Sequence, residues 1–151
     1  MVAIVDTHKK DVPTTAGQIL HTSSPFFPVR LAGMKEKIAR CKEYIAEKNF
    51  TSLGELVEAE ALEMHAIMLT SRPSLIYLTS GTLTFLKLVK KWRLEGLETY
   101  FTINTGQNIH LICERKSVDT LKNKLTSTPG VESIIINTPA IGTRLVDAHL
   151  F

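Results

Sequence analysis

Cysteines, long apolar runs and targeting signals are scarce or missing in this sequence, and each absence narrows the class of protein. Only two cysteines occur in 151 residues, and Cys41 and Cys113 stand in separate apolar segments. This arrangement argues against a disulfide framework and a cysteine metal site, so we expect two free thiols in a reducing compartment. No apolar run reaches the ~20 residues needed to cross a bilayer, and the N-terminus lacks the basic start of a signal peptide. We therefore expect a cytoplasmic location and no membrane partner.

Familiar catalytic and metal-binding motifs are also missing. The five histidines show no metal-ligand spacing, and the patterns Gly-x-Ser-x-Gly, Cys-x-x-Cys and His-Glu-x-x-His do not occur, so we expect no metal site. The net charge of +3 comes from scattered lysines and arginines, without a nucleic-acid-binding motif. Solvated helix surfaces explain this charge better than a nucleic-acid partner, which we do not expect, although the charge would suit a small anionic metabolite.

The composition that remains is typical of a globular domain, with 44% hydrophobic and 22% charged residues. A chain of this length suits one domain with a sizeable core. The spacing of apolar residues predicts helices at 25–49, 52–69, 81–95 and 117–125. Runs of apolar and β-branched residues predict strands at 2–5, 99–103, 109–114 and 131–136. Helices followed by strand, strand, helix and strand favour an α+β fold, with helices packed on one face of a mainly antiparallel sheet.

Local signals place the ends of several elements. Ser24 is the expected N-cap of the first long helix, and Ser52 with Glu55 has the spacing of a capping box for the second. Gly96 is placed to end the third helix in a left-handed conformation. The polar segment 7–24 is expected to be a loop with at most one helical turn, and its single glycine argues against a phosphate-binding loop.

The most informative stretch joins the strands at 99–103 and 109–114. It reads Asn104-Thr105-Gly106-Gln107-Asn108, and a glycine there allows a tight bend or the close approach of a ligand. This stretch resembles the active-site loop of the diphosphomevalonate decarboxylases, whose pattern is Asp-Ala-Gly-Pro-Asn. Further segments resemble that family in the same order along the chain, namely 9–14 with Gly17, 22–27, 49–55, 64–66, 73–78 and 100–102.

The resemblance implies the ferredoxin-like C-terminal domain of an enzyme in the superfamily of galactokinase, homoserine kinase and mevalonate kinase. Its members phosphorylate mevalonate 5-diphosphate with ATP and release phosphate and carbon dioxide, giving isopentenyl diphosphate for isoprenoid and other lipid biosynthesis. Residues 1–151 are then a single C-terminal domain, and the N-terminal ATP-binding half has no counterpart. We expect ATP and Mg²⁺ in the complete enzyme only, none bound by this chain alone, and no activity from the chain alone.

The same resemblance implies roles for three residues near the substrate. Thr14 matches a family serine beside the diphosphate, Thr15 matches an arginine that grips the substrate in bacterial relatives, and Asn104 matches the catalytic aspartate. An amide cannot accept the hydroxyl proton, and threonine cannot replace a bidentate guanidinium. We therefore expect catalysis to be impaired.

Three more residues complete the expected substrate-binding set. Gly106 and Asn108 match the family loop, which implies that the shape of the loop is kept. His65 is expected near the substrate, although its place between apolar positions is more typical of a half-buried histidine with satisfied hydrogen bonds.

The sequence leaves open what kind of chain this is and which enzymes it is related to. The chain is a fragment, one subunit of a split enzyme or a non-catalytic domain. Its relative could be a mevalonate or phosphomevalonate kinase without decarboxylation, or the domain could be a binding or dimerisation module. The expected partners are a phosphorylated mevalonate, the ATP-binding half in cis or in trans, and a second copy of the chain, because apolar surface should be exposed where the ATP-binding half would pack.

Overall fold

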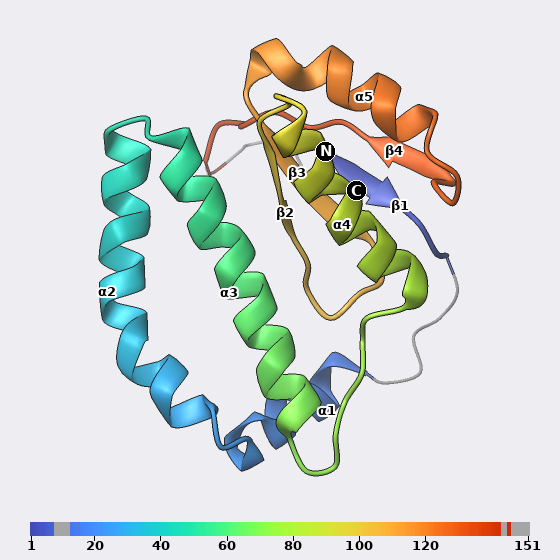
Figure 1. Ribbon diagram of the computed structural model, residues 1–151. Coiled ribbons are helices and arrows are strands. Elements are labelled where there is room, and N and C mark those ends of the chain that lie inside the picture. The colour runs from blue at the N-terminus through green and yellow to red at the C-terminus, as the bar shows by residue number, and fades with distance from the viewer. Residues whose placement is uncertain (8–12, 143–144, 146–151) are drawn as a thin grey trace.

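The computed structural model of the chain describes residues 1–7, 13–142 and 145 (Figure 1). Residues 8–12, which belong to the loop expected at 7–24 and to the family-like segment 9–14, lie outside this range. The elements follow in the order β1 (Val2–Ile4), α1 (Thr14–Leu20), the 3₁₀ turn η1 (His21–Ser23), α2 (Phe27–Ala46), α3 (Phe50–Thr70), α4 (Ser80–Leu94), β2 (Thr99–Thr102), β3 (Ile109–Cys113), the 3₁₀ turn η2 (Arg115–Ser117), α5 (Val118–Thr126) and β4 (Ser133–Ile135).

The strands form one sheet in the order β2-β3-β1-β4, and every neighbouring pair is antiparallel. Phe101 of β2 and Ile109 and Leu111 of β3 belong to one buried cluster with side chains of α4 and α5, and Ile103 joins the same cluster just after the end of β2. The expected α+β fold is therefore confirmed. In β3, buried residues alternate with half-buried ones, which decides which face of the sheet meets α4 and α5. Residues 99–101 of β2 are all buried, because α3 also packs against that strand.

Helix α3 runs beside β2, and glycine is required where the two elements come closest (Figure 1). A Cβ atom on Gly54 would lie 2.0 Å from Cδ2 of Tyr100, which is itself 2% exposed. The ring of Phe50 also meets Tyr100 edge to face, with 5.6 Å between the ring centroids. A larger residue at 54 would push α3 away from the strand.

Two of the expected helix caps are wrong, and one helix end is confirmed. Asn49 caps α3 by accepting a hydrogen bond from the Ser52 N–H at 3.1 Å, so α3 begins two residues before the expected Ser52. Ser24 does not cap α2, because its Oγ bonds to the N–H of Phe26 in a turn, and the helix starts after Phe26. Gly96 follows the last residues of α4 with φ +92°, as expected.

Helix α2 is the outermost helix in Figure 1, beside α3 and away from the sheet. The apolar stripe that predicted it is exposed over much of its length, with Leu31, Ile38 and Ile45 each at least half exposed. Helix α2 lies against α3 and η1 rather than the sheet, so one side of the stripe faces solvent. In the described part of the chain, no helix is long and apolar enough to cross a bilayer. Cys41 and Cys113 are free thiols, and each is half-buried.

Candidate functional site

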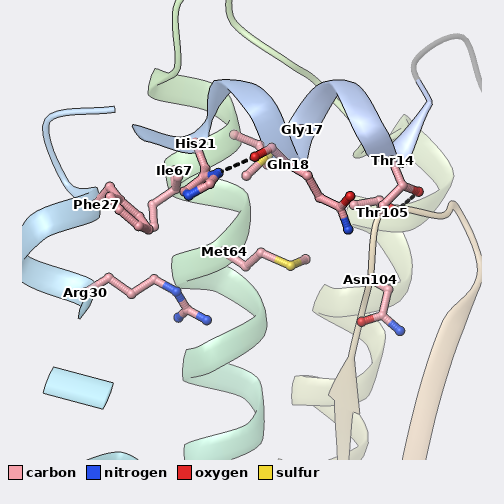
Figure 2. A pocket seen from close by; sticks show the side chains of 11 residues that line it. Thr14, Gly17, Gln18, His21, Phe27, Arg30, Met64, Ile67, Asn104 and Thr105 are labelled. Atoms are coloured by element: carbon pink, nitrogen blue, oxygen red, sulfur yellow. Dashed lines mark hydrogen bonds between the residues drawn. The ribbon is translucent and has the colours of Figure 1, made fainter. Parts of the chain in front are cut away.

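A pocket of about 400 Å³ opens between α1, α2, α3 and the loop that follows β2 (Figure 2). The apolar side chains of Met64 and Ile67, both in α3, line one side of this pocket. Polar side chains come from the loop and from the helices on either side, among them Asn104, Thr105 and Arg30. The segments that form the pocket are far apart in sequence, so only the folded chain brings them together.

One wall of the pocket is helix α1, where the sequence predicted a loop with at most one helical turn. Residues 14–20 form a seven-residue helix. Pro13 occupies its N-cap position, and no side chain makes a capping hydrogen bond there. Gly17 lets this helix lie close against its neighbours, because a Cβ there would be 3.1 Å from both Met68 Sδ and Tyr77 Oη. The Tyr77 hydroxyl also donates to the Pro13 carbonyl at 3.3 Å. Tertiary contacts therefore stabilise a short helix that its own sequence supports weakly.

The first residue of α1 is joined to the loop after β2. Thr14 and Thr105 are hydrogen-bonded through their hydroxyls at 2.9 Å, although they are 91 residues apart in the chain (Figure 2). Asn104 is exposed and lines the same pocket. Thr14 and Asn104 therefore line the same pocket, whereas Thr15 is exposed on α1 and does not line it.

The other loop residues lie beside the pocket without lining it. Gly106 is not among the described glycines with a left-handed φ, which are Gly96 and Gly130. A Cβ at 106 would meet no atom within 4 Å, so the fold itself does not require glycine there. Asn108 Oδ1 accepts hydrogen bonds from the N–H groups of residues 5 and 6, at 3.0 and 3.4 Å, and so ties the loop to the end of β1.

His65 is buried deeply in α3, one residue after Met64 of the pocket wall. It is 2% exposed, and its Nε2 has no hydrogen-bond partner among the described residues. Burial lowers the pKa of His65 below its ordinary 6.5, and the backbone of Asn104 and Ile103 opposes this only in part. The histidine therefore lies under the loop as a neutral group, deeper than the half-buried position expected for it.

We predict that this burial makes stability depend on pH through His65. Because its folded-state pKa is lowered from 6.5, the unfolded chain binds more protons below about that pH. The free energy of unfolding should fall as the pH drops from about 7.5 to about 5.5, and His65→Gln should remove part of that slope. Urea unfolding at both pH values measures the slope, with His110→Gln as the control. Equal slopes for wild type and His65→Gln would contradict the prediction.

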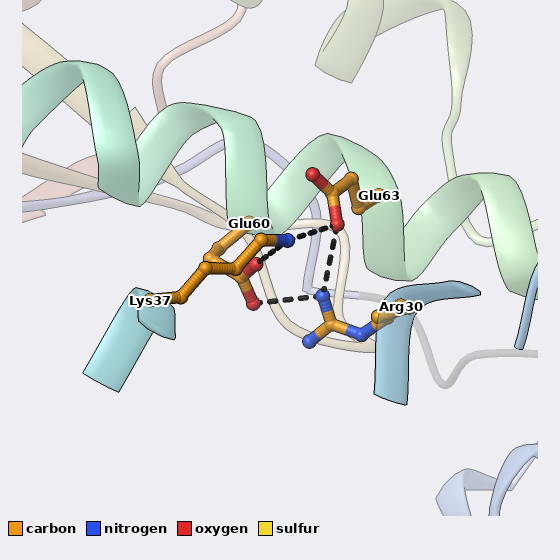
Figure 3. Close-up of polar contacts among 4 residues, drawn as sticks. All are labelled: Arg30, Lys37, Glu60 and Glu63. Carbon is orange, nitrogen blue, oxygen red and sulfur yellow. Dashed lines mark hydrogen bonds and ion pairs between the residues drawn. The ribbon is translucent and has the colours of Figure 1, made fainter. Parts of the chain in front are cut away.

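Sequence reasoning missed Arg30 and His21, which also line the pocket. His21 Nδ1 donates to the Gln18 carbonyl at 2.7 Å, and its ring meets Phe27 edge to face with 4.4 Å between centroids. Arg30 pairs across to α3, where Glu60 and Glu63 face it (Figure 3). The available signal was the spacing of charged residues along the two helices. Positions 30 and 37 share one helix face, and positions 60 and 63 share another.

No group of three or more histidine, cysteine, aspartate or glutamate side chains within the described ranges could hold a metal ion. What the described residues form is an α+β domain with an open pocket of ligand size, walled by apolar side chains and edged by amides, hydroxyls and one guanidinium.

Comparison with known proteins identifies the family. Residues 1–139 match the family model described as mevalonate 5-diphosphate decarboxylase C-terminal domain. The diphosphomevalonate decarboxylase of Candida albicans is 26% identical over 121 residues, which cover 79% of this chain and 33% of that protein. The mevalonate diphosphate decarboxylase structure from Staphylococcus aureus has a TM-score of 0.78 and 32% identity, covering 83% of this chain and 38% of that one. MDDEF in complex with MVAPP, AMPPCP and magnesium has a TM-score of 0.78 and 30% identity, with coverages of 83% and 38%.

The chain therefore belongs to the mevalonate 5-diphosphate decarboxylase C-terminal domain family. It spans about a third of the length of the curated relatives it matches. The expected fold and family are thus confirmed, and the alternative of a kinase relative without decarboxylation is not favoured.

Proposed function

We propose that this chain is the substrate-side domain of a diphosphomevalonate decarboxylase. The complete enzyme would phosphorylate mevalonate 5-diphosphate with ATP and decarboxylate it to isopentenyl diphosphate, in the mevalonate pathway of isoprenoid biosynthesis. The observation that carries the proposal is the convergence of Thr14, Thr105 and Asn104 at one open pocket, in a chain of this family. Residues 1–151 would form one domain, and the ATP-binding half would be supplied in cis or in trans.

The pocket residues have the chemistry to bind and orient a phosphorylated ligand. The hydroxyls of Thr14 and Thr105 would donate to phosphate oxygens in exchange for the hydrogen bond between them. The Asn104 amide can donate to an oxygen and accept from a hydroxyl. We propose that Asn104 orients the substrate hydroxyl without removing its proton, because an amide is not a base at neutral pH. Thr15, Gly106 and Asn108 stay in the proposed substrate-binding set, with Asn108 fixing the loop. His65, buried next to the backbone of Ile103 and Asn104, would support the loop that follows β2.

ATP and Mg²⁺ belong to the complete enzyme in this proposal. MDDEF has been solved with MVAPP, AMPPCP and magnesium, which supports a nucleotide and a metal for a decarboxylase built from both halves. The described residues of this chain offer no cluster suited to a metal ion. We therefore assign ATP and Mg²⁺ to the ATP-binding half.

A homodimer and a cytoplasmic location complete the proposal. Helix α2 exposes large apolar side chains, and exposed apolar surface often marks a protein interface. These residues are Val29, Leu31, Ile38 and Ile45. The two free cysteines suit a reducing compartment.

The experiment is a titration of the ¹⁵N-labelled chain with mevalonate 5-diphosphate, followed by amide NMR. We expect the signals of Thr14, Asn104 and Thr105 to shift, because these residues surround the proposed phosphate position. Signals of Leu121 and Leu125 in α5 serve as the control, since they are buried in the core cluster and do not line the pocket. If millimolar ligand leaves the pocket signals unmoved, the proposed function fails.

A further inference from the structure

The pocket has one permanently charged side chain among the described residues that line it, the guanidinium of Arg30. In Figure 2, Arg30 extends from α2 toward α3, and Asn104 stands at the opposite end of the pocket. Apart from the imidazole of His21, the other polar lining side chains are neutral hydroxyls and amides, from Thr14, Gln18, Asn104 and Thr105. A ligand with several negative charges needs a cation when it leaves water, and here Arg30 is placed to supply it.

Arg30 is held by carboxylates through only one of its nitrogens. Its Nη1 donates to Glu60 Oε2 at 2.7 Å and lies 3.6 Å from Glu63 Oε2 (Figure 3). Within the described part of the chain, these ion pairs leave the Nη2 and Nε donors of Arg30 unused. A guanidinium has five N–H donors in a planar fork, so Nη2 and Nε can bind two anionic oxygens side by side while Nη1 keeps its partners.

Lys37 keeps the two carboxylates paired without relying on Arg30. Its Nζ lies within hydrogen-bond distance of both Glu60 and Glu63 (Figure 3). Burial alone would lower the pKa of Lys37, but the hydrogen bonds and charges of Glu60 and Glu63 outweigh it and raise the pKa. The carboxylates are therefore partly neutralised by a cation that does not line the pocket. The two cations and the two carboxylates balance in charge, so the carboxylates orient the Arg30 guanidinium while its Nη2 and Nε donors remain available to a ligand.

We propose that Arg30 is the anion-recognition residue of this pocket, and that its Nη2 and Nε bind a pair of phosphate or carboxylate oxygens of the ligand. The identity of the ligand as a phosphorylated mevalonate rests on the proposed function, whereas the binding of an anion by Arg30 does not. The side chain is 22% exposed, so a ligand can reach it without a rearrangement of the fold.

The test uses the whole ¹⁵N-labelled chain and three ligands, each titrated separately. Inorganic pyrophosphate presents phosphate alone, mevalonate presents a carboxylate alone, and mevalonate 5-diphosphate presents both. We expect Arg30→Gln to weaken binding of mevalonate 5-diphosphate by about 10- to 100-fold, the effect of losing a charged hydrogen-bond donor pair. Arg30→Lys should lose less, because it keeps the charge and loses the planar fork. A parallel loss for pyrophosphate identifies the group as phosphate, and one for mevalonate identifies it as carboxylate.

Arg40→Gln is the matched control, because it makes the same change on the same helix, where Arg40 pairs with Glu36 and does not line the pocket. The affinity of this control variant for mevalonate 5-diphosphate should change far less than that of Arg30→Gln. Equal losses in both variants would overturn the proposal for Arg30, and so would wild-type affinity in Arg30→Gln. In either case the proposed function stands if the wild-type chain binds mevalonate 5-diphosphate. If pyrophosphate binding depends on Arg30 but mevalonate 5-diphosphate does not bind, the proposed function fails and the anion site remains. Failure of the wild-type chain to bind any of the three ligands contradicts both.

Discussion

Replacing Glu58 by alanine is expected to lower the free energy of unfolding by about 3–5 kcal/mol, because it leaves a charged group without its partner inside the fold. Glu58 lies in α3 with 8% of its side chain exposed, and it pairs with Arg93 of α4. The pair is bidentate, with Arg93 Nη1 to Glu58 Oε1 at 2.8 Å and Nη2 to Oε2 at 3.0 Å. The hydrogen bonds and charge of Glu58 raise the pKa of Arg93, so the guanidinium stays charged.

Glu58 and Arg93 also form hydrogen bonds with the backbone at the edge of the sheet. Among the strands that the structure describes, β2 is at the edge of the sheet, with β3 on one side and no strand on the other. The Phe101 N–H donates to Glu58 Oε1 at 3.2 Å, and the Thr99 carbonyl accepts from Arg93 Nη1 at 2.8 Å. The ion pair therefore satisfies backbone groups that a neighbouring strand would otherwise bind. Loss of Glu58 would leave the Phe101 N–H at this edge without its acceptor, and unpaired backbone groups at a strand edge favour pairing with another chain.

Denaturant unfolding followed by circular dichroism measures the effect of Glu58→Ala. The control is Glu95→Ala, which removes a surface partner of Lys124 and should cost much less stability than Glu58→Ala. In the double variant Glu58→Leu with Arg93→Met, the loss should be smaller than the sum of the two single losses, because no unpaired charge remains. A Glu58→Ala loss no larger than that of Glu95→Ala would contradict this account.

Much of the fold could be predicted from the sequence because periodic patterns report local structure. The strand pair around the loop at 104–108 and the helices α2 to α5 follow from apolar spacing, and Gly96 ends α4 where expected. Helix α1 could not be predicted from its own sequence, because the contacts that stabilise it come from Met68 and Tyr77, which are far away along the chain. The helix starts differ from the expected ones because Asn49 rather than Ser52 accepts the capping hydrogen bond of α3, and because the Ser24 hydroxyl binds the Phe26 N–H in a turn before α2.

The candidate site could be predicted less fully than the fold. Thr14 and Asn104 were expected at one site only through the family resemblance, and the structure adds the hydrogen bond from Thr14 to Thr105 that joins the two segments. Arg30 could not be placed, because a charged residue on an amphipathic helix is usually solvated. Glu58 posed the same difficulty, since its partner Arg93 lies 35 residues away on another helix.

Replacing Asn104 by aspartate is expected to raise the rate of ATP-dependent carbon dioxide release by about 10²–10⁴-fold, the usual contribution of a positioned general base. The expectation rests on the proposed function, in which position 104 faces the reacting hydroxyl. Asn104 is exposed and lines the pocket, so a carboxylate there needs no burial and keeps its charge at neutral pH. The change from amide to carboxylate adds a proton acceptor with little change in shape.

The measurement requires an ATP-binding half, so the chain is fused behind that part of the Staphylococcus aureus decarboxylase, a structural relative at 32% identity. Carbon dioxide and ADP are assayed together, because ADP without carbon dioxide would indicate a kinase. Asn108→Asp is the matched control, since it makes the same change in the same loop. Its side-chain oxygen is already engaged by the N–H groups of residues 5 and 6. We therefore expect no gain from Asn108→Asp, and equal rates for the two variants would rule out position 104 as the site of the missing base.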